Sequence, residues 1–267
     1  PSIIYSTSPS PSTHLVGYCL ACLTKLPWVI EFRDPWMLNP FRIPRPFKWM
    51  EDFEGWLEKK VLHKATHVVV TSMQYKRDFL MRYPLIRSED VSYIPNGFDP
   101  EDFENLSSQK YDRFTIVHSG TFYEARSPVP FLEAVALVAE REPRLRGQFQ
   151  VVFVGQRVPM TAEAVERLSL SDIVMQAGIV HHRRSLEYMT GADLLLLVPG
   201  PGDGTMPGKV YEYLAARKPI LALAAEGAVS SLILSTGTGV VVQPEDASGI
   251  ADAIISISSS GLLRGIS

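Results

Sequence analysis

The sequence is poor in the features that place a protein in a class at first sight. Two cysteines among 267 residues are too few for a disulfide framework. The 26 basic and 29 acidic residues leave a formal net charge of −3, without the excess of Lys and Arg that a nucleic-acid binder needs. No apolar run approaches the roughly 18 residues of a membrane span. These absences argue against nucleic acid as a partner and predict a protein of the cytoplasm.

The chain does contain enough apolar side chain for real cores, since 46% of its residues are hydrophobic and 10% are aromatic. At about 100–200 residues per domain, its length suits two domains of ordinary size. Short apolar runs alternate with longer amphipathic stretches, a pattern typical of parallel sheets connected by helices. We therefore predict an α/β fold with two Rossmann-like domains.

Residues 100–113 are mostly polar, lack apolar periodicity and are predicted to be a linker. Residues 1–99 form the expected first domain, with a short strand at its start, strands at 28–32, 67–71 and 91–95, and helices at 14–26, 47–64 and 73–82. Residues 114–267 form the expected second domain, with strands at 114–118, 149–154, 173–176, 193–198, 219–223 and 239–242, and helices at 130–141, 162–168, 184–190, 209–216, 228–234 and 246–256. The second domain is thus a complete Rossmann-like unit, whereas the first is incomplete.

The loop after the strand expected at 193–198 is rich in glycine, and a helix is expected to begin at Lys209. Glycines let a backbone approach a ligand closely, and a helix N-terminus attracts anions such as a diphosphate. Lys209 adds a positive charge there. Glu212 lies on the same helix face, where its carboxylate could accept hydroxyls from a ribose. The alternative is a solvated Lys209–Glu212 surface pair beside a flexible loop.

A second basic group follows the strand expected at 114–118. Ser119, Gly120 and Thr121 form a turn of small residues, and Arg126 lies a few residues beyond. Parallel sheets place ligands at the carboxyl edge of their strands, so Arg126 and Lys209 could converge on one diphosphate. Taken alone, Arg126 is better explained as a surface residue.

In the first half, Arg33 and Asp34 follow the strand expected at 28–32, and Pro35 ends that strand. A charged pair at this edge indicates either function or a satisfied ion pair. The next segment, residues 39–50, is aromatic and basic with no acid. It could lie on an anionic membrane surface or cover an acceptor groove. An ordinary Pro-rich loop is the alternative.

Two pairs of potential metal ligands are discounted. Cys19 and Cys22 form a C-x-x-C motif inside an apolar helix, with no second pair or nearby His, so we expect core residues. His181 and His182 have no carboxylate or Cys at ligand spacing and precede two arginines that would repel a cation. We predict no metal site and no cofactor.

Three segments, in their order and spacing, resemble the retaining family 4 glycosyltransferases of GT-B fold, in which two Rossmann domains face each other across a cleft. The stretch I-P-N-G-F-D at 94–99 resembles the I-P-N-G-V-D that closes the first domain of that family. The stretch F-R-D-P-W at 32–36 is similar to that of a subgroup that builds bacterial surface polysaccharides. Residues 207–220 resemble the P-S-K-L-x-E-Y-L-A-A-G-K-P-V of the same subgroup. The resemblance covers nearly the whole chain.

The resemblance implies a hexosyl transfer from a UDP- or GDP-sugar to a hydroxyl of a glycan or lipid-linked acceptor, with retention, in the synthesis of surface polysaccharide or glycolipid. The protein would work in the cytoplasm or at the inner face of the membrane. Asp34, Arg126 and Lys209 are the expected catalytic residues, with Arg33 beside Asp34 on the acceptor side. The expected donor-binding residues are Gly120, Thr121, Arg126, Ile179, Val180, Gly204, Thr205, Met206, Pro207, Gly208, Lys209 and Glu212.

The chain departs from the family pattern at two places. The E-x7-E motif of the wider family would place a glutamate where this chain has Gly204, and many members have His where this chain has Arg33. We therefore assign no catalytic glutamate there. We expect Arg126 and Lys209 to stabilise the negative charge of the departing diphosphate without a metal. The resemblance also implies further elements before Ile3 and after Ser267, which predicts a fragment.

Two other classes of function stay open. A GT-B epimerase acting on a UDP-sugar would need acid and base residues around the sugar, and the first half offers few carboxylates beyond Glu31 and Asp34. A nucleotide-sugar-binding module without activity is the second alternative.

Overall fold

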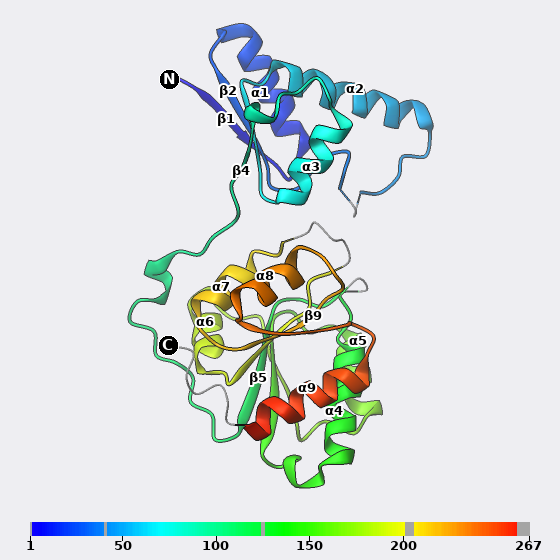
Figure 1. The fold of residues 1–267 in the computed structure, drawn as a ribbon, viewed down its shortest axis with the longest axis vertical. Helices are drawn as coiled ribbons and strands as arrows, with labels where there is room; N and C mark the ends of the chain where they lie inside the picture. Colours follow the sequence, from blue (N-terminus) through cyan, green and yellow to red (C-terminus); the bar gives the residue numbers. More distant parts are fainter. Residues whose placement is uncertain (1, 40–41, 124–125, 201–205, 261–267) are drawn as a thin grey trace. The chain divides into compact units, whose positions relative to one another are not determined.

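The computed structural model describes residues 2–39, 42–123, 126–200 and 206–260. It contains two sheets of parallel strands with helices between the strands, which confirms the predicted α/β fold (Figure 1). The chain divides into two compact units, Pro1–Asn96 and Gly97–Ser267.

The first unit holds a four-stranded sheet in the order β1-β2-β3-β4. Its strands are β1 (Ile4–Thr7), β2 (Trp28–Phe32), β3 (His67–Val70) and β4 (Val91–Tyr93), and its helices are α1 (Pro11–Thr24), α2 (Lys48–Lys64), α3 (Met73–Arg82) and the short 3-10 helix η1 (Ser88–Asp90). Alternate residues of β2, namely Trp28, Ile30 and Phe32, are fully buried and form the centre of the core. Val29 and Glu31, on the other face of the strand, are half-buried.

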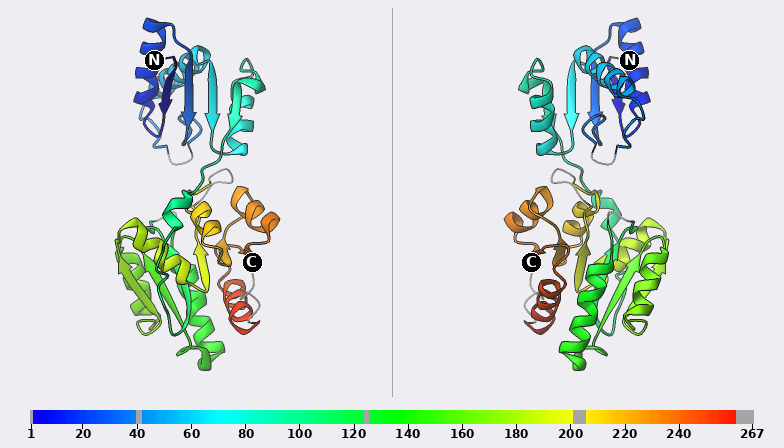
Figure 2. Two further views of the ribbon diagram at one scale, coloured as in Figure 1. Left: turned by 90° about the vertical axis from the view of Figure 1, so that its left-hand side faces the viewer. Right: turned by 90° about the vertical axis from the view of Figure 1, so that its right-hand side faces the viewer.

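The second unit holds a six-stranded sheet in the order β10-β9-β8-β5-β6-β7. Its strands are β5 (Phe114–Ser119), β6 (Phe149–Val154), β7 (Val174–Gly178), β8 (Leu194–Leu197), β9 (Ile220–Leu223) and β10 (Gly239–Val242). Its helices are α4 (Val129–Arg141), α5 (Pro159–Arg167), α6 (His182–Gly191), α7 (Lys209–Ala215), α8 (Ala228–Thr236) and α9 (Ala247–Ser260), with 3-10 turns η2 (Pro100–Phe103) and η3 (Pro143–Leu145). Apolar side chains of α4, α5 and α9 form a core on one face of the sheet, and those of α6, α7 and α8 form a core on the other (Figure 2).

The strand order reverses at the centre of this sheet. From β5 the chain builds β6 and β7 on one side and then returns to build β8, β9 and β10 on the other. The carboxyl ends of β5 and β8 are therefore neighbours at the topological switch point, where open parallel sheets leave a crevice for a ligand.

Residues 100–113, expected to be a linker, pack on the second unit. Phe103, Leu106 and Tyr111 lie against the core beneath α6, α7 and α8. The Gln109 N–H donates a hydrogen bond of 2.9 Å to the Glu187 carbonyl. The segment thus contributes to the stability of the second unit.

The expectation that Cys19 and Cys22 are core residues is wrong, because both are exposed. The buried face of α1 consists of His14, Gly17 and Ala21, which leaves the two cysteines on the other side. Because the apolar residues of α1 follow no strong periodicity, the sequence did not reveal which face of this helix is buried. Among the described residues, no helix is long and apolar enough to cross a membrane.

Candidate functional site

The two basic residues expected to bind a diphosphate lie at the switch point of the second sheet. Arg126 belongs to the loop between β5 and α4, and Lys209 is the first residue of α7, which follows β8. The two loops touch, because a Cβ placed on Gly200 would lie 2.9 Å from Arg126 Nε. The absence of a side chain at Gly200 therefore leaves room for the Arg126 side chain.

The Arg126 guanidinium lies over the ring of Tyr123, 5.1 Å from its centroid. Its Nε is buried and has no hydrogen-bond partner among the described residues. A buried donor without a partner is costly, and an anionic ligand would satisfy it.

Lys209 and Glu212 form the ion pair that the sequence offered as an alternative. Lys209 Nζ lies 2.7 Å from Glu212 Oε2, and both side chains are half-buried. The other carboxylate oxygen lies 3.4 Å from His182 Nε2, at the start of α6. His182 Nδ1 in turn lies 3.8 Å from the Asp102 carboxylate. Glu212 therefore connects the first turns of α6 and α7.

His118, near the end of β5, is a buried residue that the sequence analysis did not single out. Its Nδ1 lies 2.9 Å from the Leu196 carbonyl, which requires a proton on Nδ1. Burial lowers the pKa of His118 to about 4; the bond to the Leu196 carbonyl opposes this shift, and the charges of Arg126 and Lys209 add to it. Both cations therefore lie close enough to act on one neutral imidazole. The signal in the sequence was a polar residue inside an apolar strand.

Tyr213 fixes α7 to the ends of both central strands. Its hydroxyl accepts a hydrogen bond of 2.8 Å from the Ser119 N–H and donates one of 3.1 Å to the Leu196 carbonyl. Ser119 Oγ lies 2.7 Å from Ser185 Oγ on α6, so the turn after β5 is held on two sides. Burial raises the pKa of Tyr213, and the hydroxyl keeps its proton at neutral pH.

The other expected donor-binding residues surround this edge or lie outside the described part of the chain. The Gly120 N–H donates to the Val154 carbonyl over 2.8 Å, and Thr121 beside it is exposed. Ile179 is exposed after β7, whereas Val180 and Met206 pack against the core beneath α6 and α7. Pro207 and Gly208 precede α7 directly. Gly204 and Thr205 lie outside the described residues.

In the first unit, Arg33 and Asp34 are exposed at the carboxyl edge of β2. The Ser8 hydroxyl donates to the Asp34 carbonyl over 2.9 Å and accepts from the Asp34 N–H over 3.2 Å. The Thr71 hydroxyl donates to the Arg33 carbonyl over 3.0 Å. Neither charged side chain has an ion pair within 4.0 Å among the described residues. The loop is thus held by its backbone, which leaves both charges directed to solvent.

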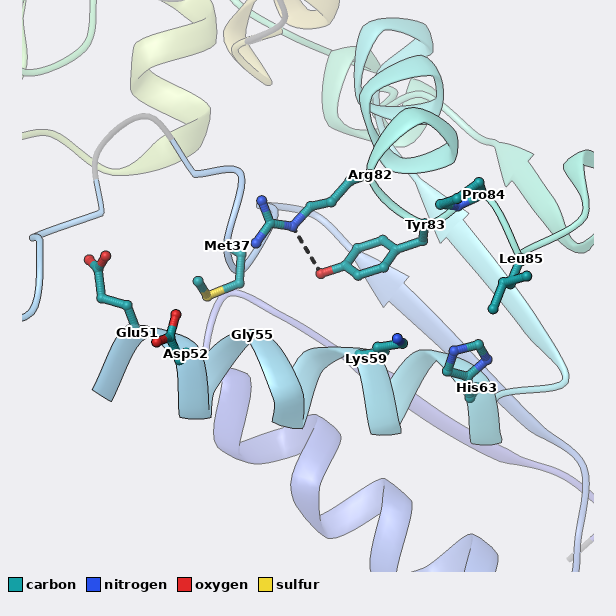
Figure 3. A pocket seen from close by; sticks show the side chains of 10 residues that line it. All are labelled: Met37, Glu51, Asp52, Gly55, Lys59, His63, Arg82, Tyr83, Pro84 and Leu85. Carbon is teal, nitrogen blue, oxygen red and sulfur yellow. Dashed lines mark hydrogen bonds between the residues drawn. The ribbon is translucent and has the colours of Figure 1, made fainter. Parts of the chain in front are cut away.

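The first unit also contains a cavity of about 490 Å³ beside α2 (Figure 3). Two of its lining residues, Arg82 and Tyr83, belong to a chain of hydrogen bonds that ends at Glu58. Arg82 Nε donates to the Tyr83 hydroxyl over 3.1 Å, and that hydroxyl donates to the buried carboxylate of Glu58. Burial raises the pKa of Glu58, while its hydrogen bonds from Tyr83 and the Met37 N–H oppose the shift. Residues from distant parts of the chain line this cavity, so their spacing gave no sign of it.

No group of three or more His, Cys, Asp or Glu side chains in the described ranges is arranged to hold a metal ion.

Several solved structures share this fold. They include the Anabaena protein HepE in complex with UDP and glucose, which is 17% identical, has a TM-score of 0.72, and aligns with 97% of this chain and 69% of its own. A glycosyltransferase from Rickettsia africae is 18% identical with a TM-score of 0.72 over 97% of this chain and 66% of its own. Sucrose-phosphate synthase from Thermosynechococcus elongatus is 20% identical with a TM-score of 0.69 over 97% of this chain and 65% of its own. These similarities define the GT-B class of fold.

The family described as glycosyl transferases group 1 matches residues 113–260, and glycosyltransferase family 4 matches residues 1–102. The chain belongs to the glycosyl transferases group 1 family, because that match spans more than half of its length. No curated protein matches the chain.

Proposed function

We propose that this glycosyltransferase binds a nucleoside-diphosphate sugar at the carboxyl edge of its second sheet and transfers the sugar to a hydroxyl acceptor. The observation that carries the proposal is the convergence of Arg126 and Lys209 beside neutral His118 at the switch point. HepE, with the same fold, is solved in complex with UDP and glucose. The donor would be a UDP- or a GDP-sugar.

The proposed reaction breaks the bond between the anomeric carbon and the diphosphate oxygen. The bonding electrons leave with the nucleoside diphosphate, whose negative charge grows in the transition state. Fixed cations stabilise such charge most when they need no reorganisation, and Arg126 is already held between Tyr123 and Gly200. Lys209 would exchange its contact with Glu212 for the diphosphate. This arrangement would work without a metal.

The acceptor hydroxyl would form the new bond from the face that the leaving group vacates, with retention of configuration. Its proton would pass to an oxygen of the departing phosphate. Asp34, exposed and with a fixed backbone, is the residue we assign to the acceptor side, together with Arg33. Retention and these acceptor roles rest on the resemblance to family 4.

Glu212 would accept hydrogen bonds from ribose hydroxyls, and the segment containing Ile179 and Val180 would border the base. The acceptor would be a glycan or a lipid-linked sugar of a surface polysaccharide or glycolipid. An epimerase and a binding module without activity are the alternative outcomes.

The test compares donor binding and turnover by the wild type, Arg126→Ala, Lys209→Ala and a control, Lys110→Ala. Lys110 is exposed a few residues before β5 and thus at the opposite edge of the same sheet. We expect each site variant to weaken UDP or GDP binding at least tenfold, because a hydrogen bond to a charged group contributes about 1.5–3 kcal/mol. The control should bind normally.

Radiolabelled UDP- and GDP-sugars distinguish the three functions. Released nucleoside diphosphate indicates transfer or hydrolysis, an isomerised sugar indicates an epimerase, and binding without either indicates a binding module. Unchanged nucleotide binding by Lys209→Ala would show that the phosphate site lies elsewhere.

A further inference from the structure

Helix α2 presents three aromatic side chains to solvent on one face. Trp49, Phe53 and Trp56 follow the spacing i, i+4, i+7 and are 65%, 52% and 52% exposed. Phe53 and Trp56 stack with ring centroids 5.8 Å apart, and Lys60 Nζ lies 5.6 Å from the centroid of Trp56. We call Trp49, Phe53, Trp56 and Lys60 the aromatic face of α2.

An exposed patch of this kind marks an interaction surface, because single exposed apolar residues are common but contiguous aromatic ones are not. Ile43 and Phe47, in the segment just before α2, are also exposed. Exposed apolar side chains therefore occur also in the chain that leads into the helix.

The charges on α2 are segregated around this face. Arg42 lies 3.0 Å from Glu51 and 2.8 Å from Glu54, and Arg45 lies 2.6 Å from Glu54. These pairs neutralise two acids of α2 with the two arginines of segment 39–50.

A third acid, Glu58, is buried and hydrogen-bonded to Tyr83, so it does not contribute to the surface. Lys60 and Lys64 remain exposed. Their spacing places them on the same face of the helix as Trp49 and Phe53. Asp52 is exposed at the edge, where it lines the cavity of Figure 3. The aromatic face itself therefore carries positive charge.

We propose that the aromatic face of α2 docks on the surface of an anionic phospholipid membrane. Tryptophan side chains prefer the membrane–water interface, where the ring is buried and its N–H stays hydrated. Lysines next to them attract anionic headgroups, each by about one kcal/mol. A second copy of this chain fits less well, since two such faces would bring lysines against lysines.

This docking surface overlaps residues 39–50, which the sequence indicated, at Ile43, Phe47 and Trp49, and it extends along α2 to Lys60. Residues 39–50 looked basic, but in the structure Arg42 and Arg45 are occupied by Glu51 and Glu54. The exposed Lys48, Lys60 and Lys64 of α2 form no ion pair among the described residues. Residues 40 and 41 of that segment lie outside the described residues.

The inference deepens the proposed function and rests on it in one respect, namely that a lipid-linked acceptor lies in a membrane. The vesicle experiment uses neither donor nor acceptor. A failure to bind vesicles therefore does not bear on the donor site, and a failure to bind the donor does not bear on the docking surface.

The experiment is co-sedimentation of the full chain with vesicles of phosphatidylcholine alone or mixed with phosphatidylglycerol. The variants are Trp49→Ala/Phe53→Ala/Trp56→Ala and Lys60→Gln/Lys64→Gln. The matched control, Met81→Ala/Met175→Ala/Leu234→Ala, removes three exposed apolar side chains elsewhere. We expect the wild type and the control to bind the mixed vesicles, with at least tenfold weaker binding by either α2 variant.

Fluorescence adds a readout that does not depend on sedimentation. Trp28 and Trp36 are buried, so a blue shift on vesicle addition should come from Trp49 and Trp56. Absence of binding to the mixed vesicles, or binding that the aromatic variant leaves unchanged, would overturn the proposal. A concentration-dependent dimer that this variant abolishes, without vesicle binding, would assign the face to a second copy instead.

Discussion

At the scale of residues, Lys209 is shared between two possible partners. In the structure its ammonium lies against Glu212, and in the proposed complex it would lie against a diphosphate. His182 contacts the other oxygen of the same carboxylate, so Glu212 would keep one partner if Lys209 moved to a diphosphate. The ion pair and the ligand site are therefore compatible descriptions of one set of side chains.

The assignment of Glu212 to the ribose leads to a prediction with a chemical control. Glu212→Ala should weaken UDP binding about tenfold or more, which corresponds to a charged hydrogen bond of about 1.5–3 kcal/mol. The same variant should not weaken binding of 2′,3′-dideoxy-UDP, because that nucleotide lacks the hydroxyls. Calorimetric titration with both nucleotides measures the difference. Equal losses for both would mean that Glu212 acts through Lys209 alone.

His118 makes the stability of the second unit depend on pH. Its pKa is about 4 in the folded protein against 6.5 for an ordinary histidine. A folded-state pKa below the unfolded one means that the unfolded chain binds the proton first. The neutral imidazole therefore contributes its full stability above pH 6.5, and this is lost as the pH falls toward 4.

Between pH 7 and pH 5 we expect His118 to account for a loss of about 2 kcal/mol in the free energy of unfolding. His118→Gln should remove that part of the pH dependence. Urea denaturation followed by circular dichroism measures it. All four tryptophans lie in the first unit, so their fluorescence provides an internal reference. An equal pH dependence in wild type and variant would contradict a neutral buried His118.

At the scale of elements, the proposed donor site lies at the carboxyl edge of the second sheet, and that edge depends on a close approach of two strand ends. Gly155 follows β6 with a φ of +150°, and a Cβ there would lie 2.1 Å from the Gly120 carbonyl oxygen. The clash is with backbone, so the Gly120 turn would have to shift. The same turn contains Ser119, whose N–H donates the hydrogen bond to the hydroxyl of Tyr213 on α7.

Gly155→Ala should therefore destabilise the second unit by about 2 kcal/mol or more and weaken UDP binding as well. Gly147→Ala is the matched control, because nothing lies within 4 Å of the position of its Cβ. Thermal unfolding with and without UDP measures both effects. A Gly155→Ala protein as stable as the control would show that the turn adapts without cost.

Element boundaries followed the sequence where the local signals were strong. The predicted bounds of β2, α3, β6 and β10 match the structure. Helix α1 instead begins at Pro11, three residues earlier than predicted, because proline is favoured in the first turn of a helix. At the other end of that helix, Lys25 takes a left-handed conformation and closes it.

At the scale of the whole molecule, the second unit holds every residue of the proposed donor site. It also has a complete six-stranded sheet with a core on each face. We therefore expect the fragment Gly97–Ser267 to fold alone and to bind UDP or GDP with the affinity of the full chain.

Nucleotide should raise the melting temperature of that fragment, since a ligand at 100 times its dissociation constant stabilises by about 2.7 kcal/mol. Sugar transfer should be absent, because Arg33 and Asp34 lie in the first unit. A thermal-shift series with nucleoside diphosphates measures the binding. Loss of nucleotide binding in a folded fragment would place part of the donor site in the first unit.

The sequence by itself determined the α/β class, the order of strands and helices, and the segments that bear Arg126, Lys209 and Asp34. It did so because periodicity, glycine and proline act locally along the chain. It could not show that Lys209 pairs with Glu212, that His118 is buried neutral beside both cations, or that Arg42 and Arg45 are neutralised by acids of α2. Those facts depend on which side chains meet after folding, and only the tertiary structure decides distances between residues far apart in the chain and the burial that sets their charge.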